Sequence, residues 1–341
     1  MAYCVSITKA GPPSVLDIQD IEIPSPKEGE ICIEVHYAGI NFADTLMRLG
    51  LYQPRPPYPF TPGYEVSGVV HSVSKNARDE FEIGQRVVAA MPTGGQCSHV
   101  AVKTSRVIAI PDEMGLDEAA AMPVTYLTSH HMLHHLGNLR KEDSVLIHGG
   151  AGGVGTAALQ LCRWAGIERV WATASGSKRE IIESLGGTAI DRHNEDFVAI
   201  IKEATDGRGV DHILDPIGGN NLTRSLSVLA EGGKLYTYGL SAAAPTAKRS
   251  LFKAFRALRK TPKFDALKLM TRNRGVFGVH MGTWKNEEVM AQQLHRIMEG
   301  YAQGHLKPVI DSVFDAKDIA KAHQHIHDAK NVGKVLLRFN K

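Results

Sequence analysis

Three glycines at a fixed spacing lie near the middle of the chain, between a short apolar run (145–147) and a helical pattern. Gly150, Gly152 and Gly155 follow the spacing G-x-G-x-x-G. In that motif the first glycine allows a tight turn, the second lets the backbone approach a pyrophosphate, and the third lets the helix pack against the strand. Unpaired N–H groups at the helix start favour the phosphate charge. This stretch predicts a dinucleotide site formed by Gly150, Ala151, Gly152, Gly153, Val154 and Gly155.

The elements that position this turn alternate between strand and helix from residue 144 onward. Six apolar runs are predicted strands: 145–147, 170–173, 188–191, 210–215, 234–239 and 275–279. Helices are expected between most of them, and three end just before a glycine, at Gly166, Gly186 and Gly232. Six parallel strands with helical crossovers form a doubly wound α/β sheet, the Rossmann arrangement.

The two ends of the chain follow another pattern. Residues 1 to about 110 read as β structure with long connections, and 52–62 holds five prolines, which is typical of a stiff surface loop. The tail holds a long helix (287–301), a short helix (317–328) and strands at 309–314 and 333–339. We assign the tail to the N-terminal domain, so the expected domains are 1–123 with 284–341, and 124–283 inserted between them.

Composition narrows the class of protein. The 341 residues are 43% hydrophobic and 22% charged, with a net charge of +3, which gives no reason to expect a nucleic-acid partner. Four scattered cysteines favour a reducing compartment over a disulfide scaffold. We see neither a leader pattern nor an apolar run long enough to span a membrane, and therefore expect a cytoplasmic protein.

Motifs along the whole chain resemble one family. Residues 38–44, Pro62-Gly63-Tyr64-Glu65 with Gly68, the loop 148–155 and Gln160 look like the zinc-free quinone oxidoreductases. These form the zeta-crystallin branch of the medium-chain dehydrogenase/reductase superfamily. Segments 248–269 and 278–282 are most similar to its vesicle amine transport protein branch. The resemblance implies a Rossmann domain inserted into a GroES-like β domain.

Zinc is expected to be absent. Alcohol dehydrogenases of this superfamily carry a cysteine and a histidine where this chain has Asn41 and Tyr64. An amide and a phenol do not replace thiolate and imidazole as zinc ligands. The stretch 91–102 contains Cys97 as its sole cysteine, which removes the structural zinc lobe as well. We therefore predict no bound metal.

The resemblance implies NADPH-dependent reduction of quinones or α,β-unsaturated carbonyls. Conjugation in such acceptors spreads the charge left by hydride transfer, so that alignment and hydrogen bonds suffice. Asn41 and Thr125 match family positions at the nicotinamide and the cleft. Tyr52 matches a tyrosine at the cleft mouth, and is either a proton donor or a half-exposed aromatic. The alternative function is an NADPH-binding interaction protein with little turnover, at a membrane surface in one version.

The cofactor is predicted to be NADPH. NAD-specific sites hold the ribose with an acidic residue at the end of the second strand. Here that strand ends at small residues, Ala174 and Ser175, which leave room for a 2′-phosphate. The resemblance places Lys178 at the phosphate-binding lysine, and Arg192 replaces a tyrosine that relatives often carry. The guanidinium of Arg192 is expected to pair with the phosphate or stack on the adenine.

Three further features carry expectations. The family resemblance predicts a homodimer that pairs strand 275–279 across a two-fold axis. Residues 250–260 are expected to form an amphipathic helix, for which two interpretations stay open. It contacts anionic lipid, or it is a cleft lid or dimer-flanking helix that buries its apolar residues against its own protein, and the second is favoured. His130, His131, His134 and His135 stand at i, i+4 spacing, and a solvated or packed pair is favoured over a metal site.

Overall fold

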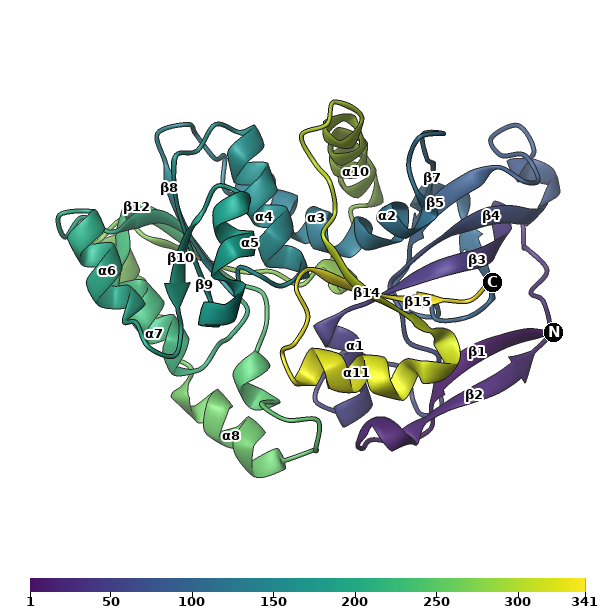
Figure 1. Ribbon diagram of the computed structural model, residues 1–341, viewed down its shortest axis with the longest axis horizontal. Coiled ribbons are helices and arrows are strands. Elements are labelled where there is room, and N and C mark those ends of the chain that lie inside the picture. Colours follow the sequence, from purple (N-terminus) through teal and green to yellow (C-terminus); the bar gives the residue numbers. More distant parts are fainter. Residues whose placement is uncertain (341) are drawn as a thin grey trace.

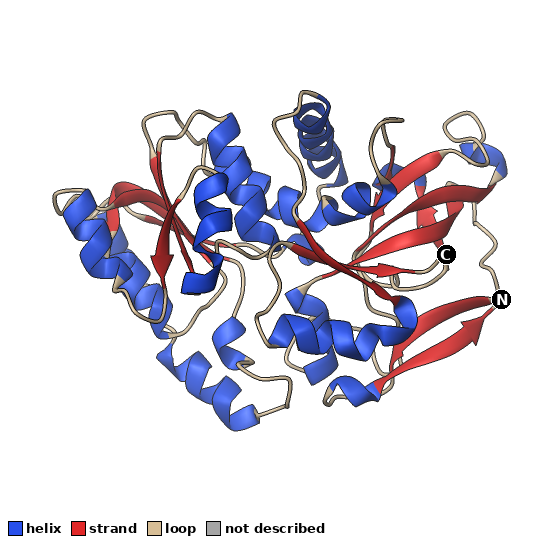
Figure 2. Ribbon diagram, viewed as in Figure 1, coloured by secondary structure: helices blue, strands red, loops and turns tan. Residues whose placement is uncertain are grey.

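The computed structural model describes residues 1–340. One half of the molecule is a six-stranded parallel sheet with helices on both sides (Figures 1 and 2). The strands are β8 (Ser144–His148), β9 (Arg169–Ala174), β10 (Thr188–Asp191), β11 (Val210–Asp215), β12 (Leu229–Thr237) and β13 (Gly275–Gly278). Their order is β10-β9-β8-β11-β12-β13, so the chain starts in the middle and winds outward in both directions. This is the Rossmann order, which confirms the predicted fold class.

Strand β8 is buried on both faces, as its continuous apolar run predicts. Val145 and Ile147 pack into one core with helices α4 (Gly153–Trp164) and α5 (Arg179–Ser184). Leu146 points the other way, into a second core with α6 (Phe197–Ala204) and α7 (Asn220–Ser227). Alternate side chains of β8 therefore contact the two layers of helices, which lie on opposite sides of the sheet in Figure 1.

A mostly antiparallel sheet is built from both ends of the chain. It contains β3 (Glu30–Ile40), β4 (Glu65–Val73), β5 (Arg86–Ala90), β6 (His99–Lys103), β7 (Val107–Ala109), β14 (Ile310–Asp315) and β15 (Lys334–Arg338). The order is β14-β15-β3-β4-β5-β7, with β6 also pairing β3. Because β15 pairs with β3, the tail joins the N-terminal sheet, as the yellow strands among the purple ones show (Figure 1).

The remaining elements connect or cover these sheets. They are the hairpin β1 (Ala2–Ile7) and β2 (Leu16–Ile21), and helices α1 (Phe42–Leu49), α2 (Leu116–Ala121), α3 (Pro123–His130), α10 (Glu287–Ala302) and α11 (Ile319–His327). The proline-rich segment 52–62 is not wholly a surface loop, because Phe60 is buried and exchanges backbone hydrogen bonds with Ile7. The surrounding prolines favour a loop in the sequence, so they give no sign that Phe60 pairs with a strand.

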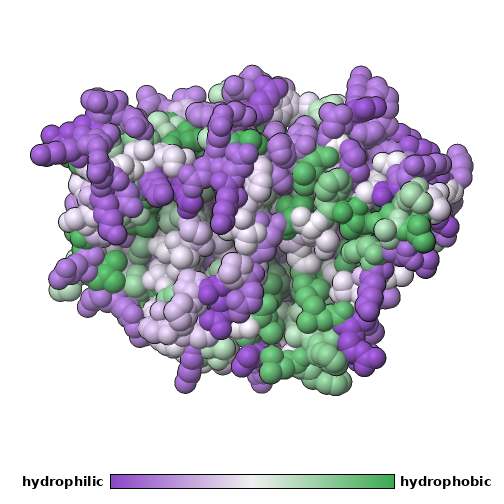
Figure 3. Space-filling model, turned by 180° about the vertical axis from the view of Figure 1, so that it is seen from behind, coloured by the Kyte–Doolittle hydropathy of each residue, from purple (hydrophilic) through white to green (hydrophobic). Residues whose placement is uncertain are grey.

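Helix α8 (Leu251–Lys260), followed by α9 (Ala266–Met270), departs from the favoured expectation. Its small residues Ala254 and Ala257 make the contact with the protein, so the large side chains point outward. Phe252 is 74% exposed and Leu251 is 60% exposed. The lid version of that interpretation, in which the large apolar residues are buried against the same chain, is therefore wrong, whereas the dimer-flanking version stays a prediction. Figure 3 shows apolar surface at this lower end of the molecule. No helix among residues 1–340 is long and apolar enough to cross a membrane.

Candidate functional site

A cavity of about 1060 Å³ opens between the parallel sheet and the β domain. Its wall includes the glycine turn, the ends of β9, β12 and β13, the starts of α1 and α3, and the segment before β15. Nearly all the predicted site residues line it: Asn41, Tyr52, Thr125, Ala151, Gly152, Gly153, Val154, Gly155, Ser175, Lys178 and Arg192. Gly150 is the exception, since it lies beneath the turn.

The glycine that makes the tight turn is not the one that the motif predicts. The residue with the left-handed backbone is Gly149, with φ of 69°, so Gly149 and not Gly150 makes the tight turn. A Cβ on Gly150 would lie 2.5 Å from the Cβ of Ala172 on β9, so Gly150 serves close packing instead. A Cβ on Gly155 would collide with the carbonyl oxygens of Gly149 and Gly150. The motif spacing could not show which of two adjacent glycines takes the turn conformation.

Gly152 leaves the turn open toward the cavity. It is the N-cap of α4, and a Cβ there would meet only the Gly149 carbonyl oxygen, at 3.3 Å. The first backbone N–H groups of a helix have no partner within it. In α4 these groups belong to residues that line the cavity, so the turn and helix start form a cradle suited to a pyrophosphate.

Basic side chains gather near the end of β9, and the residues that directly follow this strand in the chain, 175–177, include no acidic one. The Lys178 ammonium donates to the carbonyl oxygens of Ala329 at 2.7 Å and Asn331 at 2.6 Å. Burial lowers the pKa of Lys178, and the charge of Arg192 lowers it further. Arg192 is held at this place because its backbone N–H donates to the Ala174 carbonyl oxygen at 2.8 Å. Two mutually repelling cations thus lie at one cavity wall, where an anion would reduce their repulsion.

Asn41 is fixed by a buried polar cluster at the opposite wall. Its amide nitrogen donates to Glu65 Oε1 at 2.9 Å, and its amide oxygen accepts from Lys334 Nζ at 2.6 Å. Lys334 also forms an ion pair with Glu65, and both side chains are buried. Glu65 Oε2 accepts from the backbone N–H of Val124 at 2.7 Å, which ties the start of α3 to the same cluster.

Asp44 caps the start of α1. Its carboxylate accepts from the Asn41 backbone N–H at 2.7 Å and from the Gly63 backbone N–H at 3.1 Å. Burial raises the pKa of Asp44 to about 7, while these hydrogen bonds and the nearby Lys334 oppose the rise. The side chain therefore sets the backbone around Asn41 and does not reach the cavity.

The Thr125 hydroxyl is engaged within the protein, whereas the resemblance implies that it faces the nicotinamide and the cleft. Its hydroxyl donates to the Ala121 carbonyl oxygen at 2.8 Å, and the side chain is buried. A Cβ on Gly153 would lie 2.8 Å from the Thr125 methyl group, so Thr125 also packs against the glycine turn. This contact joins α3 to the turn that begins α4, at the wall of the cavity.

Tyr52 and His280 face each other in the cavity. Their ring centroids are 5.1 Å apart, and Tyr52 is half-buried. Burial raises the pKa of Tyr52, so the phenol keeps its proton at neutral pH. Both ring nitrogens of His280 are buried without a hydrogen-bond partner among the described residues. The sequence analysis missed His280, because only the fold places the loop after β13 opposite residue 52.

The four histidines are packed to different degrees: His131 is buried, His130 and His134 are half-buried, and His135 is exposed. His131 is buried, and its ring lies 4.9 Å from that of His135 and 4.3 Å from that of Trp284, measured between centroids. Burial lowers the pKa of His131 to about 4, so the ring is neutral at pH 7. The packing interpretation of this group is confirmed.

Comparisons with known proteins agree with this architecture. Residues 27–137 match the alcohol dehydrogenase GroES-like domain, and 185–337 match the zinc-binding dehydrogenases. The synaptic vesicle membrane protein VAT-1 homolog of Rattus norvegicus is 39% identical over 92% of this chain and 78% of its own length. The human quinone oxidoreductase is 29% identical over 98% of this chain and 96% of its own length. The chain belongs to the VAT-1 branch of the quinone oxidoreductase family.

One similar solved structure contains a bound cofactor. The Escherichia coli quinone oxidoreductase, complexed with NADPH, aligns with a TM-score of 0.86 at 25% identity and covers 99% of this chain and 100% of its own. The GroES-like and Rossmann parts predicted from the motifs are therefore confirmed together with the family.

We predict that the buried ion pair is essential for stability. Lys334→Met should lower the free energy of unfolding by about 3–5 kcal/mol, because the Glu65 carboxylate stays buried without its cation. The double variant Glu65→Gln/Lys334→Met should recover much of that loss, since no uncompensated charge remains. Urea denaturation measures both.

The matched control is Lys330→Met. Lys330 pairs with Asp328 at 3.1 Å, but its side chain is 65% exposed, so the loss should stay below about 1 kcal/mol. Equal effects of the Lys334 and Lys330 substitutions would contradict the role assigned to the buried pair.

Proposed function

We propose that this protein binds NADPH in the cavity and reduces quinones or α,β-unsaturated carbonyls without zinc. The observation that carries the proposal is the arrangement of Lys178 and Arg192 beside the glycine turn, with no acidic residue after β9. The cavity fits the cofactor, because the backbone at Gly152 is open and the basic pair faces the same space. The NADPH complex of the E. coli relative supports this choice.

Both backbone groups and side chains of the cavity wall bind the cofactor. Backbone groups of 151–155 bind the pyrophosphate at the α4 start, and Lys178 and Arg192 bind the 2′-phosphate. Ser175 is small enough to leave room for that phosphate. NADPH, when bound, supplies the hydride. Because an amide and a phenol stand at positions 41 and 64, this chain has no zinc ligands there to polarise an isolated carbonyl.

Polar groups at the other end of the cavity orient the acceptor. Asn41 is held rigid by Glu65 and Lys334, so its position is set before substrate arrives. The Tyr52 hydroxyl, protonated at neutral pH, donates a hydrogen bond to the oxyanion that develops on a quinone or enone oxygen. Thr125 supports the turn beside it. Together Asn41, Tyr52 and Thr125 form the proposed catalytic set.

One observation favours the second candidate, an NADPH-binding interaction protein with little turnover. Helix α8 exposes Leu251, Phe252, Phe255 and Leu258 beside several basic residues. Large exposed apolar patches mark contact surfaces for proteins or membranes. The name of the rat relative, a synaptic vesicle membrane protein homolog, is in line with this candidate.

Turnover separates the two functions. With 9,10-phenanthrenequinone or 1,2-naphthoquinone as acceptor, the purified protein should oxidise NADPH steadily, as followed by the loss of nicotinamide absorbance. A chelator should leave the rate unchanged, and simple alcohols should not be oxidised. Tight NADPH binding with no turnover of either quinone would reject the reductase and favour the interaction protein.

Lys178→Ala tests the cofactor assignment. A charged hydrogen bond contributes about 1.5–3 kcal/mol, so the substitution should weaken NADPH binding about tenfold or more and leave NADH binding nearly unchanged. Arg179→Ala is the matched control, because the neighbouring Arg179 pairs with Glu183 and Glu195 and does not line the cavity. Equal weakening of both cofactors by Lys178→Ala would contradict the assignment.

We further propose a homodimer formed through β13. This strand is the edge of the parallel sheet and pairs with β12 on one side, so its other side offers backbone groups to a second copy. The protein should show twice the mass of one chain by light scattering at micromolar concentration, and Val276→Pro should reduce it to the single-chain mass. A monomeric wild type would end this proposal.

A further inference from the structure

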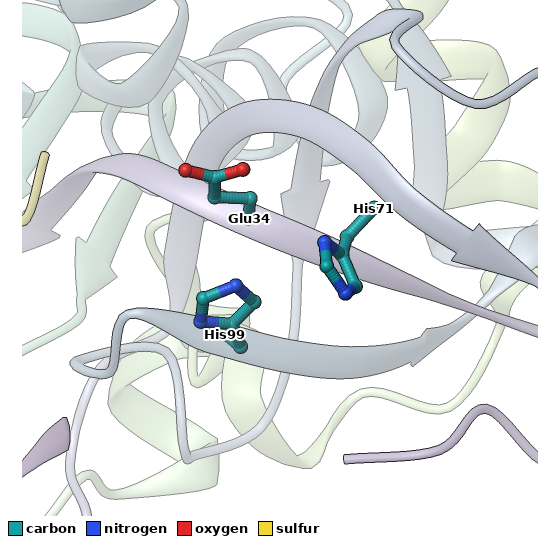
Figure 4. A group of neighbouring side chains, drawn as sticks. All are labelled: Glu34, His71 and His99. Atoms are coloured by element: carbon teal, nitrogen blue, oxygen red, sulfur yellow. The ribbon is translucent and has the colours of Figure 1, made fainter. Parts of the chain in front are cut away.

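Three strands of the β domain bring two histidines and a glutamate together on one face. Glu34 comes from β3, His71 from β4 and His99 from β6. One potential ligand atom from each lies within 4.8 Å of the others. Figure 4 shows the carboxylate and the two rings around a shared space. None of the three lines the NADPH cavity, so the cluster is separate from the proposed active site.

Strand pairing explains the cluster. Glu34 is directly opposite His99 in the antiparallel register of β3 and β6. On the other side Glu34 is opposite Val69, and His71 follows two residues later, which returns it to the same face. The register of β3 and β4 shifts at this point, because Val70 pairs with Ile33 and Ser72 with Cys32. His71 is the extra residue of this bulge, and bulges commonly redirect a side chain.

Neighbouring groups orient two of the three side chains. His99 Nδ1 lies 3.2 Å from Ser98 Oγ, which leaves Nε2 directed at the cluster (Figure 4). Asn340 donates to Glu34 Oε1 at 2.8 Å, so the second carboxylate oxygen is left for another partner. Hydrogen bonds of this kind position the ligands of protein metal sites.

We propose that Glu34, His71 and His99 bind one Zn²⁺ ion, with the fourth position open to solvent. Two imidazoles and a carboxylate suit zinc, whereas Mg²⁺ and Ca²⁺ prefer oxygen ligands alone. The three ligand atoms lie within 4.8 Å of one another, so a point among them is at most about 2.8 Å from each, against a zinc–ligand distance of about 2.0–2.2 Å. The exposed side chain of His71 can close that gap by a small rotation.

This site departs from the expectation that no metal binds. That expectation rested on positions 41 and 64 and on the stretch 91–102, where zinc dehydrogenases carry ligands. The present cluster uses residues separated by 37 and 28 positions in the chain, with no spacing that a sequence motif could reveal. Because its ligands come from three strands, a bound ion would cross-link β3, β4 and β6, and its expected role is structural.

Zinc titration of protein free of any histidine tag tests the proposal. Calorimetry with ZnCl₂ should show binding that includes one site per chain, and zinc should raise the melting temperature, whereas MgCl₂ should do neither. His71→Ala and Glu34→Gln should each remove this site, with a loss of affinity at least as large as the ~10–100-fold that loss of an outer partner causes. His71 is exposed, so its replacement should leave the fold intact.

His305→Ala is the matched control. It removes another exposed histidine, which stacks on Trp164 far from the cluster in sequence, and should leave zinc binding unchanged. NADPH affinity, measured in every variant, verifies that each is folded. The proposal is overturned if the wild type binds no zinc, or if the two cluster variants bind it as the wild type and His305→Ala do.

Discussion

The ion pair between Lys334 and Glu65 joins the two ends of the chain at the wall of the cleft. Lys334 begins β15 and Glu65 begins β4, and β3 runs between these strands. The Glu65 side chain crosses β3 at Gly39, where an added Cβ would collide with its carboxylate. The glycine in the Gly39-Ile40-Asn41 segment is therefore required by a charge pair that forms only when both chain ends meet.

That pair also determines where the chemistry can occur. A buried carboxylate without partners is costly, and Glu65 satisfies its oxygens with Lys334, Asn41 and the Val124 N–H. In doing so it fixes one amide at the β-domain wall and the first turn of α3. Thr125, the next residue of α3, packs against Gly153 in the glycine turn. One buried cluster thus aligns the acceptor side of the cavity with the cofactor side.

Repelling charges, buried ring nitrogens and exposed apolar side chains mark the proposed functional surfaces. Lys178 and Arg192 repel each other at one part of the cavity wall, and the His280 ring nitrogens have no hydrogen-bond partner among residues 1–340 at another. An anion would relieve the first and a substrate oxygen would satisfy the second. On α8 large apolar side chains are exposed to solvent, which is the physical reason for keeping an interaction function as the second candidate.

The sequence by itself determined the order of the elements, the Rossmann sheet, the return of the tail to the N-terminal domain and the position of the glycine turn. Periodicity and glycine spacing are local, so they can be read along the chain. The tertiary structure alone decided that Gly149 makes the turn, that α8 exposes its large side chains, and that His280 faces Tyr52. It also brought Lys334 to Glu65 and gathered Glu34, His71 and His99. These contacts join residues far apart in sequence, and local patterns carry no information about which distant side chains share a buried space.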